Sequence, residues 1–364
     1  MAKLRNILFA GAAALSASAA VPALTVGGAG PAVAQPMESI DWSIEHHRSD
    51  GGKIYLTVRS RRSANNESSW SNDRSIGELS GLSWAQLDGP SGPVRFALVR
   101  DAGRLDCSGT AGHGSGRGGC SLTANPGFAA YLQARGMGLP TRHQAFALTM
   151  SGVGRDLVDA LAASGFERPD VEQLTAMGIH GVTPDYIRAL SGLGYRLAAE
   201  DVVAFKIHGV EPDYIRQLAA IGPALNHIPS SELVSLKIHG VRPDFVRAMA
   251  AMGPEFRNVT AEDLVSMSIH GVRPELARSF VRLEGGRLNS DDLVAMAIHG
   301  VTAEYIEQLA ALGYRNLGAQ QLVSMAIHGV TPDYVRSLQQ AGMARLSAEQ
   351  LVRLRTSGFD PDSR

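Results

Sequence analysis

The first part of the chain alternates apolar and polar residues. In the stretch KIYLTVRS, Ile54, Leu56 and Val58 face one way and the residues between them face the other. The stretch PVRFALVRD follows the same rule, and clusters of glycine, asparagine and serine separate such runs. Period-two runs between turn signals are typical of antiparallel strands with one wet face. Residues 37–135 therefore predict a small antiparallel β domain of about six strands, sandwiched or rolled, with a C-terminal helix at GFAAYLQARG.

After about residue 136 the period becomes helical and the sequence repeats. Six units carry the word Ile-His-Gly-Val, with histidines spaced 28, 31, 31, 29 and 29 residues apart. Ser151-Gly and Ser357-Gly extend the series by 29 residues on either side, which makes eight copies of the same corner. A period of this length indicates stacked supersecondary units, and atypical end units are usual in such arrays. Residues 137–364 therefore predict an α-solenoid of about eight helical hairpins, and the whole chain an α+β multidomain protein.

Each unit predicts two short helices. One begins at Thr-Pro-Asp, with Thr331 as the N-cap, Pro332 in the first helical position and Asp333 in the first turn. The other begins at a capping box such as Thr260-Ala-Glu-Asp263 and runs through apolar residues to the His-Gly corner. There the glycine provides the left-handed residue that ends a helix.

The repeated histidine has three possible roles. A metal site needs two or more ligands that converge on one ion, and neighbouring helices lie about 8–10 Å apart, so a shared ion requires rings that turn toward each other. A catalytic role conflicts with six near-identical copies, because an active site is built once. A structural role fits best: a ring at a helix end donates to unpaired carbonyls and bridges neighbouring repeats. We expect this third role for the corner histidines, which are His180, His208, His239, His270, His299 and His328.

The N-terminus indicates export. Lys3 and Arg5 precede a small, apolar segment, and Ala-Val-Ala at residues 32–34 offers a cleavage site, so residues 1–34 predict a signal peptide. The formal net charge is −1, and the mature chain, which loses those two positive charges, is left at −3. This balance argues against nucleic acid as a partner. No later run of apolar residues reaches the ~18 that a membrane span needs, so we expect an extracytoplasmic protein, periplasmic or secreted.

Two cysteines flank a glycine-rich stretch. Cys107 and Cys120 enclose SGTAGHGSGRGG, and an even number of cysteines in an exported chain favours a disulfide, with two free thiols as the alternative. The stretch lacks the Gly-Lys-Ser/Thr of a phosphate-binding loop and favours a hairpin tip. His113 and Arg117 within it are the candidate residues for a bound small molecule or cell-wall fragment.

The units of the form LVxxxIHGVTPDYIRxL resemble a repeat of exported bacterial proteins. It is similar to the extracytoplasmic repeat region of some antirepressor metallopeptidases related to the beta-lactam sensor-transducers of the Bla/Mec type. The resemblance covers residues from about 137 to 364, and it implies a detached sensor or scaffold module. Such a peptidase would need a membrane-embedded domain with His-Glu-x-x-His, which this sequence lacks, so no catalytic residue is carried over. The units depart from the pattern at Ala303, Leu276 and Glu307, where we expect a groove or kink.

These patterns together predict a non-enzymatic interaction, scaffold or sensor protein. We expect an extended solenoid surface that binds an envelope protein or peptide, without a cofactor, a metal or stable insertion in the membrane. The alternative is a binding protein that holds its ligand at the glycine-rich loop of the β domain.

Overall fold

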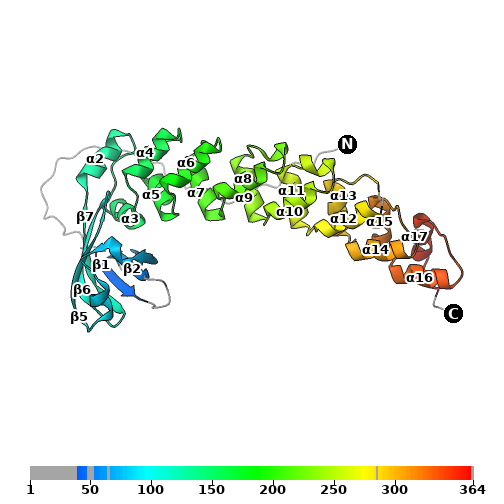
Figure 1. The fold of residues 1–364 in the computed structure, drawn as a ribbon, viewed down its shortest axis with the longest axis horizontal. Coiled ribbons are helices and arrows are strands. Elements are labelled where there is room, and N and C mark those ends of the chain that lie inside the picture. Colours follow the sequence, from blue (N-terminus) through cyan, green and yellow to red (C-terminus); the bar gives the residue numbers. More distant parts are fainter. Residues whose placement is uncertain (1–38, 47–52, 64–65, 284–285, 362–364) are drawn as a thin grey trace, which may run out of the picture.

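The chain folds as an α+β protein, as predicted, with a curled sheet followed by a row of helices. The structure is a computed structural model, and it describes residues 39–46, 53–63, 66–283 and 286–361. The segment predicted as a signal peptide, residues 1–34, lies outside the described residues. Figure 1 shows the sheet at one end of an elongated row of helices and the C-terminus at the other end.

The sheet contains seven antiparallel strands. They are β1 (Ser39–Glu45), β2 (Lys53–Ser63), β3 (Asn66–Ser75), β4 (Leu79–Ser80), β5 (Gly92–Arg100), β6 (Gly103–Gly112) and β7 (Ser115–Ala124). Their order across the sheet is β3-β2-β1-β7-β6-β5-β4. The two edge strands, β3 and β4, are joined by only a 3-10 turn, η1 (Ile76–Glu78). The sheet must therefore curl until its two edges approach each other at this turn.

The inner face of the sheet carries the alternating apolar residues. Ile54, Leu56 and Val58 are all buried, which confirms the alternation read from the sequence. A short helix, α1 (Trp84–Asp88), packs against β6 and β7. The core of this part is closed by Phe146 and Met150, which come from a helix of the following region.

The glycine-rich stretch forms most of the β6–β7 hairpin. Cys107 and Cys120 lie directly opposite each other on these strands and form the disulfide, so the free-thiol alternative is excluded. A Cβ on Gly109 or Gly118 would come within 2.2 or 2.0 Å of a carbonyl oxygen of the paired strand, and within 2.8 or 2.7 Å of the indole ring of Trp42. Its Nε1 donates to the Ser108 carbonyl at 3.1 Å. The glycines thus serve the close approach of the paired strand and of an aromatic ring.

The helical region is a stack of two layers. Its helices are α2 (Pro126–Ala134), α3 (Arg142–Ser151), α4 (Arg155–Ala163), α5 (Val171–Ile179), α6 (Pro184–Gly192), α7 (Ala199–His208), α8 (Pro212–Ala219), α9 (Ser230–Ile238), α10 (Pro243–Ala250), α11 (Ala261–Ile269), α12 (Pro274–Arg282), α13 (Ser290–Ile298), α14 (Ala303–Ala311), α15 (Ala319–Ile327), α16 (Pro332–Gln340) and α17 (Ala348–Thr356), with 3-10 turns η2 (Pro223–Leu225) and η3 (Pro254–Asn258). From α3 on, each odd-numbered helix contacts the next odd-numbered one, and each even-numbered helix the next even-numbered one. We call the odd-numbered helices α3 to α17 the corner layer and the even-numbered helices α4 to α16 the opposite layer.

The caps predicted from the sequence are formed. Thr331 accepts a hydrogen bond from the Tyr334 amide, and Pro332 occupies the first turn of α16. Thr260 and Asp263 form a reciprocal capping box at the start of α11. These local bonds define where each helix begins, and the apolar residues between the two layers form one continuous core.

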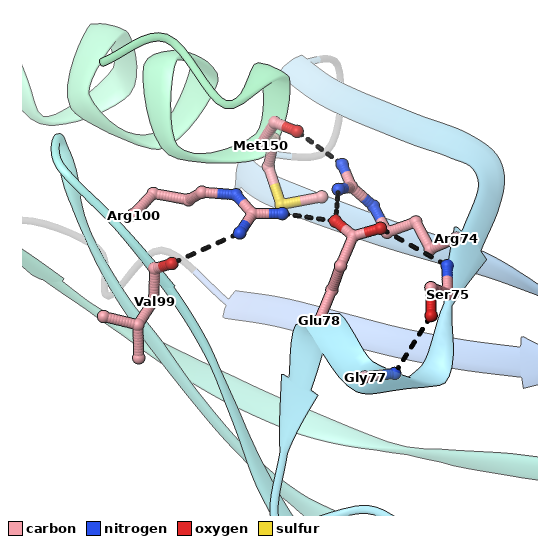
Figure 2. A network of polar contacts seen from close by, with 7 residues as sticks. All are labelled: Arg74, Ser75, Gly77, Glu78, Val99, Arg100 and Met150. Atoms are coloured by element: carbon pink, nitrogen blue, oxygen red, sulfur yellow. Dashed lines mark hydrogen bonds and ion pairs between the residues drawn. The ribbon is translucent and has the colours of Figure 1, made fainter. Parts of the chain in front are cut away.

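Helix α3 joins the two regions. Phe146 and Met150 enter the core of the sheet, whereas Leu148 belongs to the core of the helical stack. Figure 2 shows the polar contacts that hold this junction. The Arg74 guanidinium is 8% exposed and donates to the Met150 carbonyl at 2.5 Å and to Glu78 at 2.9 Å. Arg100 pairs with the same carboxylate, so Glu78 links β5 to the turn that closes the sheet.

Candidate functional site

The Gly-Val half of the repeated word is fixed by helix termination. Gly329 has a φ of +69°, and the Val330 amide donates to the Met325 carbonyl at 2.9 Å. Val330 is fully buried, as its partner Met325 is. This is the Schellman arrangement, in which a left-handed glycine is followed by an apolar residue that packs back on the helix. The other five corners have the same amide-to-carbonyl bond, so glycine and valine are required by the fold.

The histidines lie at the corner, but they do not bridge the repeats. All six are exposed. The one ring contact is that of His328 Nδ1, which lies 2.8 Å from the Ser324 carbonyl in its own helix. The ladder expected for His180, His208, His239, His270, His299 and His328 is therefore wrong. The physical reason is that the amides of the glycine and valine already satisfy carbonyls of the last turn, and the histidine side chain is left in solvent.

Tyrosines make the bridges that were assigned to histidine. The hydroxyls of Tyr186, Tyr214, Tyr305 and Tyr334 donate to the carbonyls of Val210, Val241, Val330 and Phe359 at 2.6, 2.9, 2.7 and 3.0 Å. Each tyrosine belongs to the opposite layer, and each acceptor lies just after the next corner. Burial raises the pKa of the Tyr305 phenol to about 12. The hydroxyl is hard to recognise as a repeated feature in the sequence, because Phe245 and Leu276 interrupt the series of tyrosines.

The isoleucine of the repeated word is exposed in every copy. The exposed fraction of the isoleucine lies between 51% and 57% at all six positions, which are Ile179, Ile207, Ile238, Ile269, Ile298 and Ile327. A half-buried valine lies one turn earlier in five of the six helices, at Val203, Val234, Val265, Val294 and Val323. Residues four apart share a helix face. We call the surface formed by these isoleucines and valines the isoleucine face.

A groove lies between α13 and α15 on this face. It is lined by Asp292, Ala295, Ala319, Gln320, Val323, Ser324, Ile327 and His328. Its surface is mostly apolar, with alanine and serine where larger side chains would fill it. The exposed histidine stands at the end of the groove, beside the isoleucine. The arrangement suits insertion of apolar side chains with polar contacts at the margin.

The two ends of the isoleucine face differ from its middle. In α3 the equivalent residues are Phe146 and Met150, and the sheet covers both. In α17 the position of the isoleucine is held by Thr356, which is exposed and polar. The face thus starts where the chain's own β domain has docked on it, and it stops at a polar residue.

The face could have been recognised from the sequence by counting apolar positions. The helix around Leu264, Val265, Met267 and Ile269 has four of them, but only Leu264 and Met267 are buried between the layers. A helix with one buried face needs apolar residues on that face alone, so Val265 and Ile269 form a second apolar pair that the fold does not require. Periodicity alone did not show which pair faces the core.

The loop residues His113 and Arg117 are not brought to one site. His113 lies in the two-residue β6–β7 turn with a φ of +56°, and its amide donates to the Gly89 carbonyl. Arg117 is exposed and lines a shallow depression on the sheet with Asp41, Thr57 and Arg59, among other residues, but without His113. Among the described residues no group of three histidine, cysteine, aspartate or glutamate side chains is placed to hold a metal ion.

The opposite layer carries charged pairs. Asp185 and Arg188 form an exposed pair three residues apart, and the same geometry recurs in most units. At the departure from the repeat, Glu307 instead accepts from Ser279 Oγ at 2.7 Å and from Arg282 at 2.6 Å. These bonds, Ser279 first, hold the pKa of the Glu307 carboxyl below its usual value. An open depression lies beside it, bordered by Ala303.

No family model matches the chain, and no curated protein does. Within the described part of the chain, no helix combines the length and the apolar character needed to cross a bilayer.

Proposed function

We propose that the protein is a non-enzymatic interaction protein that binds a polypeptide on its isoleucine face. The observation that carries this proposal is the row of six isoleucines, each more than half exposed at the same position of consecutive helices. Contiguous exposed apolar surface on a folded protein typically marks an interaction site. Each residue of the face is repeated, which favours an extended binding surface over a single catalytic centre.

The first repeat supports the proposal, because there the equivalent positions contact another part of the chain. There Phe146 and Met150 occupy the positions of the later valines and isoleucines, and they are buried in the core of the sheet. Thr356 shows that the last helix folds with a polar residue in the isoleucine position. Exposed isoleucine therefore serves something other than folding, and the docked sheet supports binding.

The disulfide supports a location outside the cytoplasm, because such bonds persist in oxidising compartments. Together with the segment that predicts a signal peptide, this supports a proposed partner, a protein or peptide, in the cell envelope or its surroundings.

The test is capture from envelope extract through the isoleucine face. The mature chain carries a photo-crosslinking residue at position 270, beside Ile269, in the middle of the face. We expect one adduct that disappears in the double variant Ile238→Asp/Ile269→Asp. The matched control is Val281→Asp, because Val281 is 45% exposed but lies in the opposite layer, on α12. An adduct equally strong in the double variant, or none at all, would contradict the proposed function.

A further inference from the structure

The isoleucine face combines a repeat length with hydrogen-bonding margins that together favour one partner geometry. We propose that its partner is an extended segment in the polyproline II conformation, with an apolar side chain at every third residue and basic residues between them. This inference rests on the proposed function, because it names the class of polypeptide that the face takes.

The spacing is the first argument. Consecutive corner-layer helices are in contact, and packed helix axes lie about 8–10 Å apart, so the grooves repeat at about that distance. A polyproline II helix rises ~3.1 Å per residue with three residues per turn, so every third side chain points the same way at about 9 Å intervals. In a β-strand the third residue points to the opposite side. In an α-helix the side chains of one face recur about every 5 Å, or about every 10.5 Å when only every second turn is counted, but the carbonyls of a helix are bonded internally and would leave the donors of the groove margin unused.

The shape of the groove is the second argument. Between α13 and α15 the groove is lined by the small residues Ala295, Ala319 and Ser324 together with Val323 and Ile327. The residue equivalent to Ser324 is small in every unit of the face: Ala176, Ala204, Ser235, Ser266, Ala295 and Ser324. By this equivalence we assign one aliphatic side chain to each junction between neighbouring corner-layer helices from α5 to α15. Five such junctions correspond to a segment of about 15 residues at three residues per groove.

The polar margins are the third argument. A polyproline II segment has no internal hydrogen bonds, so its carbonyls need donors. The exposed histidines provide one ring beside each isoleucine, and five of these six rings make no hydrogen bond to any of the described residues. The other margin is acidic, since the first turns of α5 to α13 in the corner layer carry carboxylates without a basic residue among them. These carboxylates are Glu172, Glu200, Asp201, Glu232, Glu262, Asp263, Asp291 and Asp292. They complement a partner with lysine or arginine between its apolar residues.

The face is also continuous with an interface that already exists. The chain's own sheet covers the first position at Phe146 and Met150. At the other end, in α17, Thr356 replaces the isoleucine, and Arg353 replaces the small residue that is equivalent to Ser324. The proposed partner is thereby confined to the six central helices.

The experiment compares synthetic peptides of identical composition. The first is an 18-residue peptide with six Pro-Lys-Leu units. The second contains the same residues with its leucines alternately two and four residues apart. Binding to the mature chain is measured by isothermal titration calorimetry at 150 mM salt. We expect the first peptide to bind at least about tenfold more tightly. The double variant Ile238→Asp/Ile269→Asp should lose a similar factor, and Val281→Asp should lose none.

A second pair of measurements tests the histidines. His239→Ala/His270→Ala should weaken binding of the first peptide about threefold or more while the melting temperature stays unchanged. Equal affinity for the two peptides, or affinity that survives the double isoleucine variant, would overturn the inference. If neither peptide binds but the envelope adduct still depends on Ile238 and Ile269, the spacing argument is wrong and the proposed function stands. A wild-type dimer in sedimentation that becomes monomeric in the isoleucine variant would identify a second copy as the occupant and would also overturn it.

Discussion

The tyrosine bridge gives the sharpest test of what holds the repeats in register. Tyr214 is 8% exposed, and its hydroxyl donates to the Val241 carbonyl of the next corner at 2.9 Å. The Lys237 ammonium lies 4.8 Å from the centre of its ring. The substitution Tyr214→Phe removes the hydroxyl and keeps the ring, so it isolates the hydrogen bond from packing.

The expected cost is about 1–2 kcal/mol. A buried acceptor that loses its partner costs about 1–3 kcal/mol, and the ring packing and its contact with Lys237 are retained. The reverse change is available in the next unit, where Phe245 stands in the tyrosine position. Phe245→Tyr should bring a hydroxyl toward the Val272 carbonyl and stabilise the protein by up to about 1 kcal/mol.

Urea unfolding followed by circular dichroism at 222 nm measures both changes. Tyr55→Phe serves as a control, because Tyr55 is 43% exposed, and it should stay within about 0.5 kcal/mol of the wild type. His239→Ala should also stay within that range, because its ring is exposed and makes no bond to the neighbouring repeat. A neutral Tyr214→Phe, or a His239→Ala that costs more than Tyr214→Phe, would refute the assignment of the bridge to tyrosine.

Three further outcomes are expected. Arg74→Met should destabilise the sheet by about 2 kcal/mol, because it leaves the Met150 carbonyl without its buried donor. The three tryptophans all lie in the sheet region, so their fluorescence should show unfolding at a lower urea concentration. The stability contributed by neutral Tyr305 should be complete below about pH 10, where the phenol of the unfolded chain titrates, and it should be lost as pH rises toward the folded pKa of about 12. Alkaline unfolding followed by absorbance at 295 nm measures this loss. The variant Tyr305→Phe should flatten the dependence of stability on pH. Reduction of Cys107–Cys120 should cost about 2–3 kcal/mol in the same tryptophan assay, and an unchanged transition would show that the hairpin does not depend on the bond.

The sequence by itself determined the local features of this protein. The alternation of Ile54, Leu56 and Val58 predicted strands, and the caps at Thr260 and Thr331 predicted where helices begin. The corner glycines predicted where helices end. These signals are reliable because each depends on a few neighbouring residues, whose backbone geometry and hydrogen bonds are the same wherever the segment lies.

The tertiary structure decided which side chains meet and which remain in solvent. The residues Ile-His-Gly-Val recur together in the sequence, but in the structure the valine is buried, whereas the isoleucine and the histidine are exposed. The reason is that the neighbouring layer determines which face of the helix is covered. The same holds for the bridge from Tyr214 to Val241, which joins residues 27 apart. It holds for Met150 as well, which occupies the isoleucine position in α3 and is buried only because the sheet curls against that helix. Burial is a property of the assembled neighbours, and a repeat pattern alone cannot specify it.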